Sequence, residues 1–160
     1  MANNKSIVAK AFKFQPFSKK QLELLSWWTK ESPYKDKFIC VADGSVRSGK
    51  TIVAITSFVL FLMSNFNYQN ASISGKTVMT VRRNLVNPLK QICLTLGIEV
   101  IDHRSENFLE LRQGKTCNII YIFGGKDERA QDMVQGLTLA CSLIDEVVLM
   151  PESFYNQLLS

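Results

Sequence analysis

The stretch Gly44-Ser-Val-Arg-Ser-Gly-Lys-Thr51 decides how the rest of the chain is interpreted. It matches the pattern G-x-x-x-x-G-K-[ST] at every fixed position. A short apolar run, Phe38 to Ala42, precedes it, and a longer one, Ile52 to Met63, follows it. We therefore predict a buried strand over 38–42, a glycine turn, and a buried helix over 51–66. This strand, loop and helix order is the context in which the pattern binds phosphate.

The residue types in this loop suit a nucleotide triphosphate. Glycines allow successive backbone N–H groups to turn toward an anion, and the helix that follows presents its positive amino-terminal end to the same anion. Lys50 is expected to neutralise the β- and γ-phosphates, and the hydroxyl of Thr51 to ligate Mg²⁺. The guanidinium of Arg47 is expected to reach the γ-phosphate, although an exposed loop arginine is the alternative. The other loop positions are Gly44, Ser45, Val46, Ser48 and Gly49.

Two carboxylates follow the apolar run Ala140 to Ile144, which we predict to be a strand. Asp145 would hold Mg²⁺ through water, as the second acidic element of a phosphate-loop site. Glu146 lies one residue further on, where it would orient and deprotonate an attacking water, and this favours ATP hydrolysis over transfer to a small metabolite. A solvated strand end is the alternative, but the phosphate loop elsewhere in the chain favours the functional interpretation.

The remaining pattern predicts an α/β fold. A capping box formed by Ser18 and Gln21 predicts a helix over 18–30. Apolar periodicity and turn residues then predict strands at 76–81, 98–101, 108–111 and 118–123, and helices at 84–96 and 127–134. Alternating strands and helices, with several strands apolar on both faces, are typical of a three-layer fold whose mainly parallel central sheet is covered by helices.

Composition sets the outer limits of the interpretation. The chain has 160 residues with 46% hydrophobic content, which suits one domain with a real core. Its formal net charge of +5 favours polyanionic partners without requiring them. The 4 cysteines form no C-x-x-C pair, so a zinc site has little support. The longest apolar run is shorter than the roughly 20 residues that cross a bilayer, so we expect a cytoplasmic protein without a membrane partner.

Two further side chains of the leader have competing interpretations. The amide of Gln21 offers a donor and an acceptor for adenine, but the same amide is the N3 partner of the Ser18 capping box. One amide cannot fully serve both roles, so the two alternatives stay open. Trp27 and Trp28 are interpreted as packing inward in preference to forming a base-stacking platform.

Three charged positions away from the loop receive weaker interpretations. Arg129 is a candidate arginine finger for a neighbouring subunit, and a solvated helix charge explains it equally well. The pair Arg82 and Arg83, expected at the end of the second strand, is interpreted as a solvated strand terminus in preference to a DNA contact. His103 has no second histidine beside it with which to bind a metal, so we assign it no role.

Taken together, these motifs resemble the ATPase part of the large terminase subunit of tailed phages, near the PBSX-type branch. The resemblance extends over nearly the whole chain and implies a P-loop ATPase fold of the additional-strand, catalytic-glutamate type. It rests on Phe17-x-x-x-Gln21, Ser32-Pro-Tyr34, Asp43 to Thr51, Gly75-Lys-Thr, Arg82-Arg-Asn84, Phe123-Gly-Gly-Lys-Asp-Glu-Arg129, Gln135-Gly-Leu-Thr138 and Ile144-Asp-Glu146.

The resemblance implies an ATP- and Mg²⁺-dependent motor that drives double-stranded DNA into a procapsid. Its implied partners are the portal protein, a small terminase subunit that recognises the DNA, and further copies in a ring on the capsid. It also implies adenine binding by Gln21. On this basis we expect a leader and helix at 1–35 and an ATPase core at 36–160.

The sequence departs from the family pattern in two ways. Gln135 stands where relatives often carry a basic residue that acts across subunits. The chain also ends before the coupling strand and nuclease domain that the family would lead us to expect, so we expect an incomplete core. Two other functions stay open, namely a non-catalytic nucleotide-binding remnant and another DNA-dependent P-loop ATPase such as a helicase.

Overall fold

The computed structural model describes residues 12–44, 48–125, 134 and 136–159. Its centre is a 5-stranded sheet with the order β2-β3-β4-β1-β5. β1 pairs in parallel with β4 and with β5, whereas β3 runs antiparallel between β4 and β2. Every strand except β3 therefore points the same way, and the predicted mainly parallel sheet is confirmed. The strands are β1 (Asn70–Gly75), β2 (Glu99–His103), β3 (Phe108–Gln113), β4 (Thr116–Gly124) and β5 (Leu139–Ile144).

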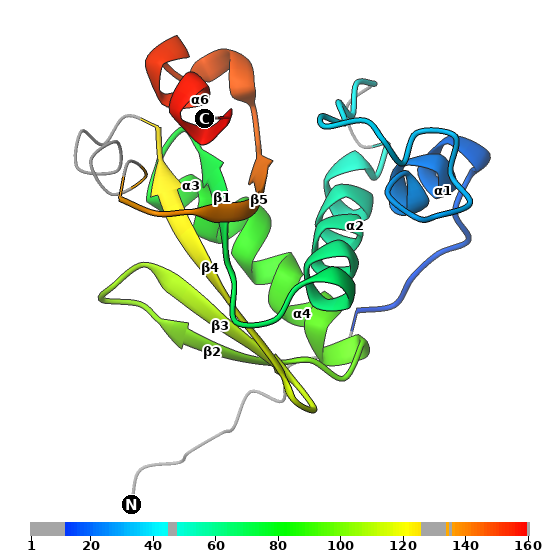
Figure 1. Cartoon of the computed structure of the whole chain (residues 1–160), viewed down its shortest axis with the longest axis horizontal. Helices are drawn as coiled ribbons and strands as arrows, with labels where there is room; N and C mark the ends of the chain where they lie inside the picture. The colour runs from blue at the N-terminus through cyan, green and yellow to red at the C-terminus, as the bar shows by residue number, and fades with distance from the viewer. Residues whose placement is uncertain (1–11, 45–47, 126–133, 135, 160) are drawn as a thin grey trace, which may run out of the picture.

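Helices pack against both faces of this sheet, with α2 and α4 on one face and α6 on the other near the strand ends. Side chains alternate along β4, so Ile120 and Ile122 face the core shared with α2 and α4, and Phe123 faces Phe154 of α6. Figure 1 shows α6 near the carboxyl ends of the parallel strands. The helices are α1 (Lys19–Ser26), α2 (Lys50–Asn65), α3 (Val78–Val81), the π-helix η1 (Arg82–Val86), α4 (Asn87–Thr95), the 3-10 helix η2 (Val147–Leu149) and α6 (Glu152–Leu159). No helix of the described residues is long and apolar enough to cross a membrane.

The central strand β1 was not predicted, and the strand predicted over 76–81 is wrong. β1 has the sequence Asn-Ala-Ser-Ile-Ser-Gly, in which Ile73 is the one β-branched residue and no residue is aromatic, so it does not have the composition that marks a strand. Its small side chains are buried between two parallel neighbours, so tertiary pairing and not propensity forms it. The next residues form a helix because the Thr77 hydroxyl accepts from the N–H of Thr80 in a capping box. Arg82 and Arg83 therefore lie on a helical turn and not at a strand end.

The strand predicted over 38–42 is also wrong. This segment pairs with no described strand, and Phe38 and Val41 are 81% and 79% exposed. The chain between α1 and α2 lies beside the amino-terminal end of α2 and not along the sheet (Figure 1). Apolar β-branched content favours a strand only where backbone groups find a neighbouring strand, and no neighbour is present here among the described residues.

The other elements agree with the prediction apart from their ends. The helix predicted over 51–66 is α2, and strands predicted over 98–101, 108–111, 118–123 and 140–144 are β2 to β5. The predicted turn near Gly114 joins β3 to β4 with a φ of 59°. The helix predicted over 84–96 corresponds to the end of η1 together with α4, and helical structure begins earlier, at α3. Helix 18–30 ends at Ser26, and the helix predicted over 127–134 lies outside the described residues except for Val134.

A buried amide joins the end of α2 to the sheet. Asn118 of β4 is fully buried, and its Oδ1 accepts from the N–H of Gln69 at 3.0 Å. Its Nδ2 donates to the carbonyl of Phe66, also at 3.0 Å. These bonds satisfy backbone groups where the chain leaves α2 and enters β1, a place where unsatisfied groups would be costly.

A charged cluster ties η1 and α4 to β2. The carboxylate of Asp102 on β2 forms ion pairs with Arg82 of η1 at 3.0 Å, with Lys90 of α4, and with Arg104 at 3.5 Å. The Asp102 side chain is only 12% exposed. Burial by itself raises the pKa of this carboxyl, but hydrogen bonds from Lys90 and Arg82 outweigh it and hold the pKa below its ordinary value. The cluster therefore stabilises the fold while Asp102 is ionised.

We expect Asp102→Asn to lower the free energy of unfolding near pH 7 by about 1.5–3 kcal/mol, because it removes a charged acceptor of several hydrogen bonds. A folded-state pKa below the unfolded one gives stability that is present above the unfolded pKa and is lost as pH falls through the folded pKa. The difference in unfolding free energy between the parent chain and Asp102→Asn should therefore become smaller below about pH 4. Urea unfolding at several pH values measures it, with the exposed carboxylate change Glu99→Gln as control. A gap that does not vary with pH would contradict this assignment.

Candidate functional site

The phosphate loop enters α2 through a glycine in a conformation that other residues rarely adopt. Gly49 has φ 76° and is the N-cap of α2, whose first residue is Lys50. A Cβ at Gly49 would lie 3.0 Å from Nε2 of Gln21. The first N–H groups of a helix have no partner within the helix, and the amino-terminal end of a helix such as α2 favours an anion. Ser48 and Thr51 beside this turn are exposed.

The side chain of Lys50 folds back over the loop. Its Nζ donates a hydrogen bond to the carbonyl of Gly44, the first glycine of the motif. Gly44 itself has φ 151°, and its N–H donates to Oδ1 of Asp43 at 2.7 Å. The ammonium group of Lys50 therefore contacts the first residue of the loop. Ser45, Val46 and Arg47 lie outside the described residues.

Gln21 uses both ends of its amide, but in a way that the sequence did not reveal. Its Oε1 accepts from the N–H of Ser18 at 2.8 Å, which completes the predicted capping box of α1. Its Nε2 donates to the carbonyl of Ser48 in the phosphate loop at 2.9 Å. The amide therefore joins α1 to the loop, and in this arrangement both of its ends are engaged.

Asp145 follows the end of β5 beside β1. Its backbone N–H donates to the carbonyl of Ser74 at 2.9 Å. A Cβ at Gly75 would lie 3.9 Å from Cβ of Asp145, so the two chains approach closely at the corner of the sheet where β1 and β5 end. Burial and then the charge of Glu146 raise the pKa of the Asp145 carboxyl, and no basic side chain of the described residues contributes to the shift. A bound cation would offset that desolvation of the ionised carboxylate.

Glu146 has an unusual backbone for a residue with a side chain. Its φ of 52° and ψ of 50° place it in the left-handed region, where it is the N-cap of η2. Its side chain is exposed. Sparsely populated backbone conformations cost about 1–3 kcal/mol and concentrate at functional sites. The exposed Glu146 therefore lies at a strained turn directly after the half-buried Asp145.

The sheet topology brings the loop and the two carboxylates to the same edge. α2 contacts β4 and β5, and its amino-terminal end lies at the carboxyl ends of the parallel strands (Figure 1). Lys50 opens α2, and Asp145 comes directly after β5. Ligands of open α/β sheets bind at this edge. No hydrogen bond or ion pair of the described residues joins Asp145 or Glu146 to Thr51.

The sequence analysis overlooked Ser72 and Ser74, although they are fully buried beside this corner. Oγ of Ser72 donates to Oγ of Ser142 on β5 at 2.8 Å. Oγ of Ser74 has no hydrogen-bond partner among the described residues. Because β1 itself was not recognised, no sequence signal placed these hydroxyls next to Asp145.

The weaker candidates have structural explanations where they are described. Trp28 donates from Nε1 to Oγ of Ser57 at 3.2 Å, and its ring packs 5.5 Å from that of Phe61, so the inward-packing interpretation is confirmed. His103 stacks on Phe108 at a ring distance of 4.2 Å. Arg129 lies outside the described residues.

The two contacts of Gln21 can be separated by mutation. We expect Gln21→Glu to keep the capping box, since a glutamate also accepts from Ser18, but to lose the donor to the Ser48 carbonyl. Amide hydrogen exchange over 48–53 should then become faster while α1 stays protected, at a cost of about 1 kcal/mol in stability. Ser18→Ala should do the opposite, fraying α1 with the loop contact retained. Unchanged exchange over 48–53 in Gln21→Glu would contradict this role.

No family model and no curated protein matches the chain. Solved structures do match it. The large terminase of a thermophilic bacteriophage is 51% identical and covers 91% of this chain with a TM-score of 0.87. Its complexes with ADP and with ATP-γ-S are 49% and 48% identical, with TM-scores of 0.83 and 0.81. They cover 90% and 89% of this chain, which corresponds to 35% and 34% of theirs.

A more distant match supports the fold alone. The large terminase ATPase domain of a Thermus phage is 17% identical over 70% of this chain, which covers 51% of that domain, with a TM-score of 0.51. The chain spans 36% of the thermophilic phage terminase, about a third of its length. Within this chain, however, the match extends over 91% of the residues. The chain therefore belongs to the family of phage large terminases.

Proposed function

We propose that this chain is the ATP-binding and ATP-hydrolysing part of a phage DNA-packaging motor. The observation that carries the proposal is the loop at the amino-terminal end of α2, with the ammonium of Lys50 folded over Gly44 at the sheet edge where Asp145 and Glu146 lie. Relatives about half identical to the chain were solved in complex with ADP and with ATP-γ-S, which supports a nucleotide as the ligand.

The loop supplies the phosphate contacts. Its residues, Gly44 to Thr51, would surround the β- and γ-phosphates with backbone N–H groups, and the positive end of the α2 dipole would favour the same anion. Lys50 would move from the Gly44 carbonyl to the phosphates, a short displacement for a flexible side chain. Arg47 would stabilise negative charge on the γ-phosphate as the bond to the leaving phosphate breaks.

The donor set fits Mg²⁺. The Thr51 hydroxyl and the Asp145 carboxylate are hard oxygen ligands, and Mg²⁺ is typically held by one or two such groups together with water and substrate phosphates. Among the described residues no group of 3 or more His, Cys, Asp or Glu side chains is placed to hold a metal. The proposed site would therefore take its remaining ligands from water and the substrate phosphates. The raised pKa of Asp145 marks a carboxylate that a cation would stabilise. Bound Mg²⁺ would neutralise charge on the phosphate oxygens.

Hydrolysis requires a base and an oriented water. Glu146 would accept the proton of a water that attacks the γ-phosphorus, and the exposure of its side chain next to Asp145 supports this role. The amide of Gln21 would have to exchange one of its present contacts to bind adenine, since both its ends are engaged. Loop movement on nucleotide binding would release it.

The proposed partners follow from the terminase family. ATP turnover would drive double-stranded DNA into a procapsid through the portal protein, with a small terminase subunit selecting the DNA and several copies of the chain acting as a ring in the host cytoplasm. The net charge of +5 is compatible with a polyanionic substrate. A helicase would share the loop chemistry, and unwinding of a forked duplex without a capsid would identify one.

Nucleotide binding is tested by thermal unfolding with and without Mg·ATP-γ-S. A ligand at a hundredfold excess over its Kd stabilises the native state by about 2.7 kcal/mol. For a chain of this size we expect the melting temperature to rise by about 5–10 °C. Lys50→Ala should lose the rise, and Lys115→Ala, which changes a lysine in the β3–β4 turn, should keep it. No shift in a cooperatively folded parent chain would refute the proposal.

Turnover separates an enzyme from a nucleotide-binding remnant. We expect Glu146→Gln to lower the rate of phosphate release by at least about a hundredfold, because it removes the general base. The stabilisation by Mg·ATP-γ-S should be retained, since Glu146 is not a phosphate contact. Glu23→Gln, on the exposed face of α1, serves as the matched control. Equal rates for Glu146→Gln and the parent chain would leave nucleotide binding without catalysis.

A further inference from the structure

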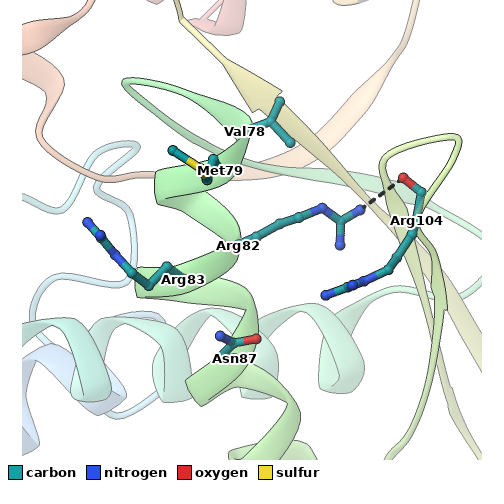
Figure 2. A pocket seen from close by; sticks show the side chains of 6 residues that line it. All are labelled: Val78, Met79, Arg82, Arg83, Asn87 and Arg104. Carbon is teal, nitrogen blue, oxygen red and sulfur yellow. Dashed lines mark hydrogen bonds between the residues drawn. The ribbon is translucent and has the colours of Figure 1, made fainter.

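An open hollow of about 600 Å³ lies on α3 and η1, apart from the phosphate loop. It is lined by Val78, Met79, Arg82, Arg83, Asn87 and Arg104. Figure 2 shows Arg82 and Arg83 leaving the helix in opposite directions, with Arg104 reaching back from the turn between β2 and β3. Two elements far apart in the sequence therefore present arginines to one surface, which we call the arginine surface.

The arginine surface carries more positive charge than its partners neutralise. Asp102 is shared by Arg82, Lys90 and Arg104, so one carboxylate faces three cations. Arg104 lies at the outer end of this cluster and its side chain is 75% exposed. Glu106 in the same turn is exposed, and it forms no ion pair with a described residue. The cluster therefore keeps a positive surplus toward solvent.

Arg83 adds a further charge on the other side of the hollow. Its side chain is exposed, and the bond described for it runs from Nε to Oδ1 of Asn84 at 3.1 Å. Among the described residues no carboxylate pairs with it. A guanidinium keeps its charge at any physiological pH and presents several N–H donors in one plane. Arg83 is therefore available to an anion from outside the molecule.

Hydrogen bonds connect the elements that carry these arginines. Besides Asp102, the guanidinium of Arg82 donates to Oδ1 of Asn107 at 3.2 Å and to the carbonyl of Arg104 at 3.5 Å. It thereby fixes the β2–β3 turn against η1, as the dashed contact in Figure 2 shows. η1 is a π-helix, a rare form that occurs often at functional sites. The fold thus holds Arg83 and Arg104 on opposite sides of one hollow.

We propose that the arginine surface binds the phosphate backbone of double-stranded DNA. The proposal rests on the packaging function proposed above, and it adds where the chain would contact its substrate. Separated guanidinium groups around an open hollow fit successive phosphates of a backbone better than one enclosed small anion. The amide of Asn87 would donate to a phosphate or sugar oxygen, and the 77% exposed Met79 would contact a sugar. Contacts of this kind carry no base sequence information.

The test is the salt dependence of duplex binding, measured by fluorescence anisotropy with a labelled duplex at several NaCl concentrations. The logarithm of the binding constant falls linearly with the logarithm of salt concentration, by about 0.9 for each phosphate contact. We expect Arg83→Ala and Arg104→Ala each to reduce this slope by about 1, equally on two duplexes of unrelated sequence. Arg83→Lys and Arg104→Lys should restore most of the slope, because they keep the charge.

Lys115→Ala is the matched control. It removes one exposed positive charge at the opposite end of β3, about 20 Å along the strand from the β2–β3 turn. Arg83 and Arg104 are exposed, so their alanine variants should fold, and melting temperatures check this. Arg82 is left unchanged, because its removal would disturb the Asp102 cluster.

Each outcome decides the proposal. Slopes of both arginine variants equal to that of Lys115→Ala would overturn it. So would a parent chain that is stabilised by Mg·ATP-γ-S but does not bind the duplex at low salt, and this result would leave the nucleotide site intact. Competition by polyglutamate as strong as by unlabelled duplex would also overturn it, in favour of an acidic protein partner. DNA binding that depends on both arginines without any nucleotide stabilisation would support the arginine surface while the ATPase function fails.

Discussion

The packing of α2 against the sheet is the constraint on which the rest of the molecule depends. Ile55, Val59 and Leu62 of α2 are fully buried in the same cluster as Ile73 of β1 and Ile120 of β4. Once this face is buried, the amino-terminal end of α2 must lie at the carboxyl edge of the parallel strands (Figure 1). The phosphate loop and Asp145 share one edge of the molecule because of that hydrophobic contact and not because of any direct bond between them.

Single side chains then set the details of this edge. Gly49 allows α2 to begin directly after a left-handed turn, and Gln21 holds α1 against the loop through the Ser48 carbonyl. The leader helix α1 is therefore joined to the loop and is not an independent appendage. Gly75 allows the close approach between Val81 of α3 and the corner at Asp145, since a Cβ there would lie 2.8 Å from Cγ2 of Val81. Gly49 and Gly75 thus allow α1, α2 and α3 to approach this edge of the sheet closely.

The same close approach connects the nucleotide edge to the arginine surface. Val81 packs on the strand end beside Asp145, and Arg82 and Arg83 follow it directly in the chain. In the function proposed above, α3 and η1 would therefore connect the nucleotide-binding edge to the DNA-binding arginine surface. The Asp102 cluster holds the far side of this element against β2.

The sequence by itself determined the phosphate loop, the capping box of α1, the helix α2 and the family, because these depend on local spacing and residue type. It also predicted β2 to β5, whose apolar runs are bounded by turn residues. It failed at β1, whose polar, small side chains are buried only because β4 and β5 pair with it on both sides. It failed again over 38–42, where an apolar segment has no neighbouring strand among the described residues.

Tertiary structure alone decided which distant side chains meet. No spacing in the chain shows that the amide of Gln21 reaches the Ser48 carbonyl, or that Arg104 faces Arg83 across a hollow. Such contacts depend on how elements pack, and packing follows from the summed burial of many side chains, which a local pattern does not encode. The loop could therefore be located from the sequence, whereas the residues that support it and the arginine surface became visible only in the fold.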